Sequence, residues 1–253
     1  MKYFNWIDKS ILKATWRYYA LKIAPRGLQV RIELTNNLTY ILRGRQADKT
    51  VFKEIWLTSL YDQYGVKVEK GDTVVDIGAH VGIFSTYAAE LSKTGTIFSF
   101  EPFKENFERL NFHKTLNYKA NMVTFNLGIA GDSGKKVFHI NEKNSGGNSL
   151  FKGKNKTKKI EINTIRLSDF CTQENIKRID FLKIDCEGAE YDILEQAPSF
   201  LNFTQKIIME THPYQGKSVF RLIEILKSNG FRIHNESEIV SDQTLNMVYA
   251  SKA

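Results

Sequence analysis

Cysteine is scarce in this chain, and long apolar runs are absent. The 253 residues include 2 cysteines, Cys171 and Cys186, which form neither a CxxC pair nor a disulfide framework. No stretch approaches the ~18 apolar residues of a membrane-spanning helix. The N-terminus lacks the uninterrupted apolar core and small-residue cleavage site of a signal peptide. We therefore expect a cytoplasmic protein in a reducing compartment.

Acidic residues are fewer than basic ones: 28 Asp and Glu stand against 36 Lys and Arg, a net charge of +8. Such an excess can indicate nucleic acid, an acidic glycan or an anionic membrane surface. Much of it falls in the polar run Lys152 to Lys159, and charge runs of this kind are usually solvated. We therefore expect no nucleic acid partner. The length suits one α/β domain with an appendage.

Residues 1–70 are expected to form this appendage. Residues 3–23 have the spacing of an amphipathic helix with a basic, aromatic-rich character. Such a helix either makes peripheral contact with a membrane or packs on its own domain or on a second subunit of a homo-oligomer. Strands at 28–34 and 38–42 form a hairpin around Asn36-Asn37. A helix over 49–64 follows, with Asp48 as its N-cap.

The stretch Thr73 to Gly82 organises the rest of the chain. The β-branched run Val-Val-Asp-Ile predicts a buried strand with Asp76 near its end, followed by a glycine turn and a helix. Ligands bind in the crevice that such a strand–turn–helix unit forms. A dinucleotide fingerprint needs glycines at the first, third and sixth places, but counting from Gly78 these later places hold His80 and Ile83. A nicotinamide enzyme is therefore disfavoured.

A second carboxylate supports a nucleoside cofactor. The next strand, 96–101, ends at Glu101-Pro102, 25 residues after Asp76. A carboxylate at the end of the second strand can accept hydrogen bonds from both ribose hydroxyls. Together with the spacing Asp-x-Gly-x-x-x-Gly, this resembles the first motifs of class I S-adenosylmethionine-dependent methyltransferases.

Residues 71–253 then alternate regularly between strands and helices. Strands are expected at 122–129, 180–186, 206–212, 231–235 and 245–251. Residues from about 135 to 160 form an insertion with a polar loop too long for a plain connection. The last two strands have no helix between them, which predicts one antiparallel strand. We therefore expect a Rossmann-like α/β sheet of seven mostly parallel strands, as in class I methyltransferases.

Further polar groups follow two later strands. The strand at 180–186 offers Lys183 and Asp185, and the strand at 206–212 offers Glu210 and His212. Because parallel strands end at one edge of a sheet, these side chains are expected to converge. Glu187 and Glu190 lie in the turn after Asp185, where they either serve the site or cap the following helix. His113, His139 and His234 do not cluster and are expected at the surface.

These motifs together resemble the FkbM family of methyltransferases. The resemblance spans about residues 28–250 and rests on Asp-Ile-Gly-Ala-His-Val-Gly, on Glu101-Pro102, on Leu-Lys-Ile-Asp-Cys-Glu-Gly-Ala-Glu-Tyr at 182–191 and on Glu-Thr-His at 210–212. It implies O-methylation with S-adenosyl-L-methionine as donor. His80 departs from the asparagine that is more usual in the family. The resemblance places donor contacts at Asp76, Gly78, Ala79, His80, Gly82, Glu101, Pro102, Asn126, Gly128 and Asp185.

A hydroxyl is a poor nucleophile, so it needs a base within reach or a metal that lowers its pKa. We expect His212 or Asp185 to take the proton and Glu187 and Glu210 to orient the acceptor, with Lys183 also in the catalytic group. Mg²⁺ held by Asp185, Glu187 and Glu210 is an alternative, and so is a structural hydrogen bond for His212. The expected acceptor is a sugar, a glycan or another small polyhydroxylated molecule.

A different class of function stays open from sequence. The basic loop and the N-terminal helix would also suit a non-catalytic module with the cofactor fold that binds an anionic polymer or a membrane surface. The acidic groups at the strand ends argue against it, because they would repel such a ligand.

Overall fold

The computed structural model describes residues 11–13, 15–141, 146–151, 156–214, 216–239, 241 and 244–252. At its centre lies a seven-stranded sheet in the order β11-β12-β10-β9-β3-β4-β5. Among these strands β12 alone runs antiparallel to its neighbours, which confirms the expected fold class. The strands are β3 (Val74–Ile77), β4 (Ile97–Phe100), β5 (Met122–Phe125), β9 (Ile179–Ile184), β10 (Thr204–Thr211), β11 (Phe231–Ile233) and β12 (Asn246–Lys252).

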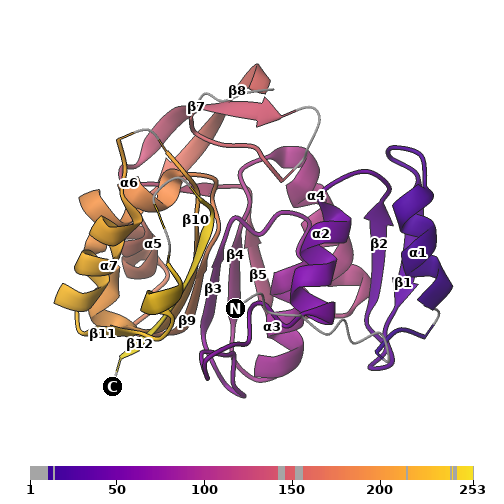
Figure 1. The fold of residues 1–253 in the computed structure, drawn as a ribbon, viewed down its shortest axis with the longest axis horizontal. Helices are drawn as coiled ribbons and strands as arrows, with labels where there is room; N and C mark the ends of the chain where they lie inside the picture. The colour runs from indigo at the N-terminus through magenta and orange to yellow at the C-terminus, as the bar shows by residue number, and fades with distance from the viewer. Residues whose placement is uncertain are drawn as a thin grey trace.

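Helices cover both faces of this sheet (Figure 1), which is why its central strands are mostly apolar. All four residues of β3 are buried, Asp76 included. One layer contains α2 (Asp48–Phe52), α3 (Ile83–Ser92) and α4 (Lys104–Leu116), and the other contains α5 (Leu167–Gln173), α6 (Ala189–Gln196) and α7 (Val219–Ser228). Short 3-10 helices, η2 (Pro198–Phe203) and η3 (Glu236–Glu238), follow α6 and β11.

The N-terminal part, here residues up to 70, begins with elements that flank the layer of α2 and α4 (Figure 1). It contains α1 (Thr15–Ile23) and the expected hairpin of β1 (Gln29–Glu33) and β2 (Thr39–Arg43). Its buried residues share one hydrophobic cluster with β3 and α3. The start of the expected helix, residues 3–10, lies outside the described residues. The division of the chain near residue 70 stays a prediction.

The helix expected over 49–64 is shorter and different in kind. It consists of α2 and a π-helical turn, η1 (Lys53–Leu57), and the chain bends from Thr58 onward. Asp48 is not its N-cap, because Ala47 holds that position. The Asp48 carboxylate instead binds Arg43, whose Nη2 lies 2.8 Å from Asp48 Oδ1.

The expected strand over 122–129 is two strands. β5 ends at Phe125, and β6 (Gly128–Ile129) belongs to a separate three-stranded sheet with β7 (Gly134–Asn141) and β8 (Lys156–Ile165). The chain leaves the main sheet here because Gly128 pairs with Thr164. Part of the expected insertion therefore has regular structure, and its residues 142–145 and 152–155 lie outside the description.

Two histidines expected at the surface are buried. His113 has no exposed surface and His139 is 5% exposed. His113 is held between two backbone groups: its Nε2 accepts the Ile41 N–H at 3.0 Å, and its Nδ1 lies 2.7 Å from the Val81 carbonyl. Both cysteines are free thiols. Among the described residues, no helix has the length and apolarity needed to cross a membrane.

Candidate active site

A cavity of about 530 Å³ opens at the carboxyl ends of β3, β4, β9 and β10. The three-stranded sheet and residues 45–54 complete its walls. It is lined by most of the expected site residues, namely Gly78, His80, Glu101, Pro102, Gly128, Asp185, Glu187, Glu210 and His212. Asp76, Ala79, Gly82, Asn126, Lys183 and Glu190 are not among its lining residues.

The glycine turn after β3 is required by close backbone packing. Gly78 has φ +78°, and a Cβ there would overlap the carbonyl oxygen of Asp185, the residue after β9. Gly82 has φ +83°, and a Cβ there would overlap the side chain of Leu110 on α4. Gly78 therefore lets the cavity floor approach β9, whereas Gly82 lets α3 approach α4. The Ala79 N–H donates to the Phe100 carbonyl at 2.9 Å and so joins the ends of β3 and β4.

Glu101 lies at the end of β4 with its carboxylate in the cavity wall. Its two oxygens accept the backbone N–H groups of His80 at 2.8 Å and of Phe103 at 2.9 Å. Burial nevertheless raises the pKa of Glu101 to about 8. Asn126 is exposed and donates to the carbonyls of Glu101 and Pro102, each at 2.9 Å. It therefore holds the turn that positions Glu101.

His80 contributes a neutral ring to the same wall. Its φ of +51° lies in the left-handed region, which histidine and asparagine tolerate better than most residues. Burial lowers the pKa of His80 to about 4, although its Nε2 lies 4.0 Å from the Asp48 carboxylate.

Lys183 and Asp76 form a buried ion pair behind the cavity floor. Lys183 Nζ lies 3.0 Å from Asp76 Oδ1 and 3.5 Å from Asp185 Oδ2, and it donates to the Gly78 carbonyl at 2.9 Å. Burial acts to lower the pKa of Lys183, but the two carboxylates outweigh it and raise that pKa. Lys183 therefore stays protonated and ties β3 to β9. Asp76 is fully buried and also accepts the Ser85 hydroxyl at 2.6 Å.

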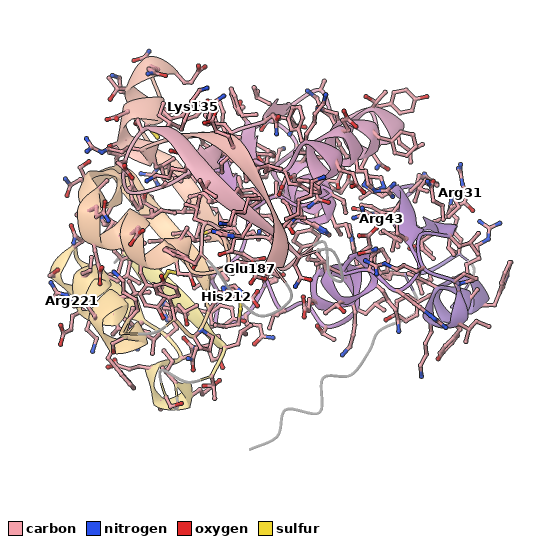
Figure 2. All side chains as sticks on the ribbon, turned by 90° about the horizontal axis from the view of Figure 1, so that it is seen from above. Arg31, Arg43, Lys135, Glu187, His212 and Arg221 are labelled. Carbon is pink, nitrogen blue, oxygen red and sulfur yellow. The ribbon has the colours of Figure 1, made fainter. Side chains whose placement is uncertain are left out.

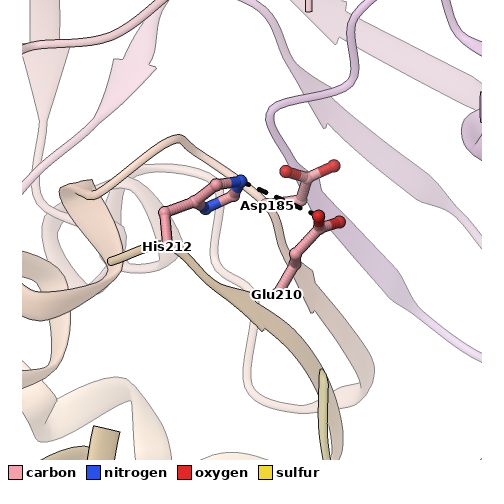
Figure 3. A group of neighbouring side chains, drawn as sticks. All are labelled: Asp185, Glu210 and His212. Carbon is pink, nitrogen blue, oxygen red and sulfur yellow. Dashed lines mark ion pairs between the residues drawn. The ribbon is translucent and has the colours of Figure 1, made fainter. Parts of the chain in front are cut away.

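Asp185, Glu210 and His212 converge on one point of the cavity, as Figure 3 shows. Each offers an oxygen or nitrogen atom, and these atoms all lie within 4.8 Å of one another. His212 Nε2 lies 3.8 Å from Glu210 Oε1 and 3.7 Å from Glu187 Oε1, and Glu187 and His212 lie together near the centre in Figure 2. The group that could hold a metal thus contains His212 in place of Glu187, which was expected there.

Glu190 orients His212 through contacts with its backbone and with its ring. Its fully buried carboxylate accepts the His212 backbone N–H at 2.7 Å and lies 3.3 Å from the ring Nδ1. Its other oxygen accepts the N–H of Gly188, the N-cap of α6, at 2.8 Å. Burial alone would lower the pKa of His212, but the hydrogen bond and charge of Glu190 and the charges of Asp185 and Glu187 raise it to about 10. His212 is therefore protonated at neutral pH, which argues against its expected role as proton acceptor.

Sequence reasoning missed the contribution of the N-terminal part. Glu54, on η1, lines the cavity. Burial and the charge of Asp185 raise the pKa of Glu54 to about 7. The buried Tyr61 hydroxyl donates to Glu210 Oε2 at 3.4 Å. No sequence signal marked either residue, because a glutamate in a predicted amphipathic helix normally faces solvent.

Comparisons with known proteins identify the family of this chain. The family model "Methyltransferase FkbM domain" matches residues 76–233. The chain is 24% identical over 236 residues to the 31-O-demethyl-FK506 methyltransferase FkbM of Streptomyces tacrolimicus, covering 82% of this chain and 90% of that protein. It is 23% identical over 146 residues to the hexuronic acid methyltransferase AglP of Haloferax volcanii, covering 58% of each.

A solved structure supports the fold. The methyltransferase FkbM from Methylobacillus flagellatus KT superimposes with a TM-score of 0.50 at 13% identity, over 75% of this chain and 46% of that one. Family membership favours an enzyme over the non-catalytic binding module considered from sequence. The chain belongs to the FkbM methyltransferase family, whose members are S-adenosylmethionine-dependent enzymes of the class I methyltransferase fold.

Proposed function

We propose that the protein methylates a hydroxyl oxygen of a sugar, a glycan or another small polyhydroxylated acceptor. The observation that carries this proposal is the convergence of Asp185, Glu210 and His212 on the cavity that Glu101 also lines. One edge of the sheet thus combines a carboxylate suited to ribose with groups suited to an acceptor hydroxyl. The names of two relatives, one acting on a hexuronic acid and one at a 31-O position, are consistent with such an acceptor.

Residues of this chain would hold S-adenosylmethionine across β4 and β3. Glu101 has lone pairs left on both oxygens for the ribose hydroxyls. The apolar wall of Ile129, Phe138 and Ile162 suits the adenine ring of the donor. When bound, the donor supplies an electrophilic methyl group, so the protein has to align the acceptor and move one proton. Asp185 and Glu210 line the cavity away from Glu101, after β9 and on β10, and an acceptor hydroxyl would lie there.

Glu210 is the better proton acceptor in this arrangement. Its carboxylate lies in the cavity, and burial together with the charge of Asp185 raises the pKa of Glu210 to about 8. With this pKa Glu210 is mostly protonated at pH 7 but ionises as the pH rises towards 8, whereas His212 stays protonated there, so Glu210 is the group of the two that can accept a proton in mildly alkaline solution. Asp185, the carboxylate expected from sequence, would then orient the hydroxyl, and protonated His212 would fix Glu210 from 3.8 Å.

A divalent cation also fits these residues. Two carboxylates and one imidazole form a mixed oxygen and nitrogen donor set, which suits Mn²⁺ or Zn²⁺ better than Mg²⁺. Glu190 behind His212 resembles the carboxylate that orients a histidine ligand in many metal sites. Such a cation would lower the pKa of the acceptor hydroxyl.

A methyl-transfer screen tests the proposal. The protein is incubated with labelled S-adenosylmethionine and with nucleotide-sugars or cell-envelope glycans, before and after dialysis against a chelator. We expect label on a hydroxyl oxygen, and we expect Glu210→Gln and Asp185→Asn to lose most turnover while keeping donor affinity within a few-fold. Activity that survives chelation supports the carboxylate base, whereas loss that Mn²⁺ restores supports the metal. Label on nitrogen alone would refute O-methylation.

The exposed face of α1 supports peripheral membrane contact as an additional property. Trp16, Tyr19 and Ile23 share one face and are 66%, 51% and 78% exposed. Lys22 and Arg26 beside them are exposed cations. Aromatic and basic groups together suit an anionic lipid surface.

Sedimentation with phosphatidylglycerol vesicles tests this contact. Binding should exceed that to phosphatidylcholine and should fall when Trp16 and Tyr19 become serine. The control, Phe220→Ser on α7, replaces a residue that is 45% exposed elsewhere. Equal binding of all variants would overturn the membrane proposal, and loss of a dimer in the serine variant would indicate a second copy instead.

A further inference from the structure

Glu54 differs from the other carboxylates that line the cavity. Asp185 lies 3.5 Å from Lys183, and Glu187 and Glu210 lie within 3.8 Å of His212. Glu101 accepts two backbone N–H groups. Within the described part of the chain, no hydrogen bond and no ion pair within 4 Å holds the Glu54 carboxylate.

The backbone that carries Glu54 is held firmly at the cavity wall. η1 is a π-helical turn in which the Thr58 N–H bonds to the Lys53 carbonyl at 3.0 Å. Ile55 and Leu57 on the same turn are 2% and 1% exposed and anchor it in the core. Glu54 therefore enters the cavity wall from an element that cannot easily rotate away. Such π-helical turns occur frequently at functional sites.

Glu54 is acted on most strongly by a charge of its own sign, that of Asp185, and more weakly by the opposite charges of Lys53 and Lys183. Its carboxylate interacts electrostatically with Asp185 and Glu210 across the cavity. Lys183 lies behind Asp185 and does not line the cavity. Like charges in a partly desolvated space repel one another, and a bound cation relieves that repulsion. The arrangement is suited to a positively charged group of a ligand.

The strand order indicates which cationic group this is. With the ribose at Glu101, just after β4, the donor's amino-acid arm would extend across the end of β3 towards Asp185, just after β9. Neighbouring strands lie about 4.8 Å apart, so these two strand ends are separated by roughly 10 Å. The arm carries an α-ammonium group a few bonds beyond the sulfur. Glu54 lines the same cavity as Gly78 and Asp185 and interacts electrostatically with Asp185.

We propose that Glu54 is a donor-binding residue whose carboxylate binds the α-ammonium group of S-adenosylmethionine. The N-terminal part of the chain thus contributes directly to the donor site. This inference rests on the donor half of the proposed function, and its test needs no acceptor. Its failure is therefore distinguishable from a wrong acceptor class.

Calorimetry with two ligands tests the assignment. S-adenosylhomocysteine retains the ammonium group, and its desamino analogue lacks it. The intact protein should bind S-adenosylhomocysteine about tenfold or more tightly than the analogue, as expected for one charge-assisted hydrogen bond. In Glu54→Gln this preference should shrink to a few-fold, because affinity for S-adenosylhomocysteine falls while affinity for the analogue does not.

The matched control is Glu187→Gln, which removes another cavity carboxylate and should keep the full preference. Equal weakening of both ligands in Glu54→Gln would mean a merely structural role and would overturn the proposal. Unchanged binding of S-adenosylhomocysteine in Glu54→Gln would overturn the proposal as well. So would a Glu54→Gln variant that changes only the Michaelis constant of an amine-bearing acceptor, because Glu54 would then bind the acceptor and not the donor. If the intact protein bound neither ligand, the donor site itself would be wrong.

Discussion

The buried carboxylate of Glu190 contacts His212 twice, at the backbone N–H and at the ring Nδ1. This pairing keeps the ring nitrogen Nε2 directed at Glu210 and Glu187. It also explains why a histidine buried to this extent is protonated, since an unpaired buried imidazole would be neutral.

Glu190→Gln should therefore lower the pKa of His212 from about 10 towards its ordinary value. The amide removes the negative charge and keeps the volume. We expect a decrease of at least about one unit, measured by following the His212 ring proton by NMR as pH is raised. Glu187→Gln is the control and should act more weakly, because Glu187 lies 3.7 Å from the ring and is partly exposed. An unchanged His212 pKa in Glu190→Gln would contradict this assignment.

Lys183→Met should destabilise the fold strongly. It leaves Asp76 as an uncompensated charge in the core, a change that costs about 3–5 kcal/mol when one partner of a buried pair is removed. Urea unfolding would measure the loss. The double variant with Asp76→Asn should recover part of it, because the orphan charge is gone. Losses that simply add would show that the two residues do not act as a pair.

Gly78→Ala should prevent both stable folding and donor binding. The added Cβ overlaps the Asp185 carbonyl, and the positive φ adds strain. Gly65→Ala is a matched control, since Gly65 has φ +76° and a Cβ added there would meet no atom within 4 Å. It should cost only the conformational strain of about 1–2 kcal/mol. Similar melting temperatures for the two variants would refute the packing explanation.

Acidification should destabilise the protein through His80. Its folded pKa of about 4 lies below the unfolded value of about 6.5. The unfolded state thus binds more protons between these values, and stability is lost as pH falls from 6.5 towards 4. The His80 contribution between pH 7 and pH 5 is about 2 kcal/mol. Urea unfolding at pH 7 and pH 5 measures the free energy of unfolding lost between these two values. The loss should be correspondingly smaller in His80→Asn than in the original protein, and an equal loss in both would show that His80 does not cause it.

Much of the fold and part of the site follow from local sequence patterns. The β-branched run before Gly78 predicts β3, and the strand that ends at Glu101 predicts the second carboxylate of the cavity. The convergence of Asp185, Glu210 and His212 follows because parallel strands end at one edge.

The remainder depends on contacts between distant segments. His113 is buried because β2 covers it, and its partner Ile41 lies 72 residues away. From sequence, Lys183 is a cation near the end of a strand. In the structure it is buried, because it forms an ion pair with the buried Asp76. Glu54 occupies a π-helical turn that helical periodicity does not distinguish from an ordinary helix. None of these three roles is visible in the residues next to them.

Glu101→Gln should separate donor binding from folding. Because the folded pKa of Glu101 is raised to about 8, the unliganded protein loses stability as pH rises from 4.5 to 8. The amide removes this penalty, although its nitrogen cannot accept the backbone N–H of His80 or of Phe103 and one of these groups loses its acceptor. Because the two effects oppose each other, the variant should melt close to the original protein at pH 8. It should nevertheless bind the donor more weakly, since the amide nitrogen cannot accept a ribose hydroxyl.

Calorimetric titration of S-adenosylhomocysteine into the original protein and into Glu101→Gln tests whether Glu101 binds the donor. We expect one micromolar site in the original protein and at least tenfold weaker binding in Glu101→Gln at a similar melting temperature. Absence of binding in the original protein, or equal affinity in the two proteins, would contradict this expectation.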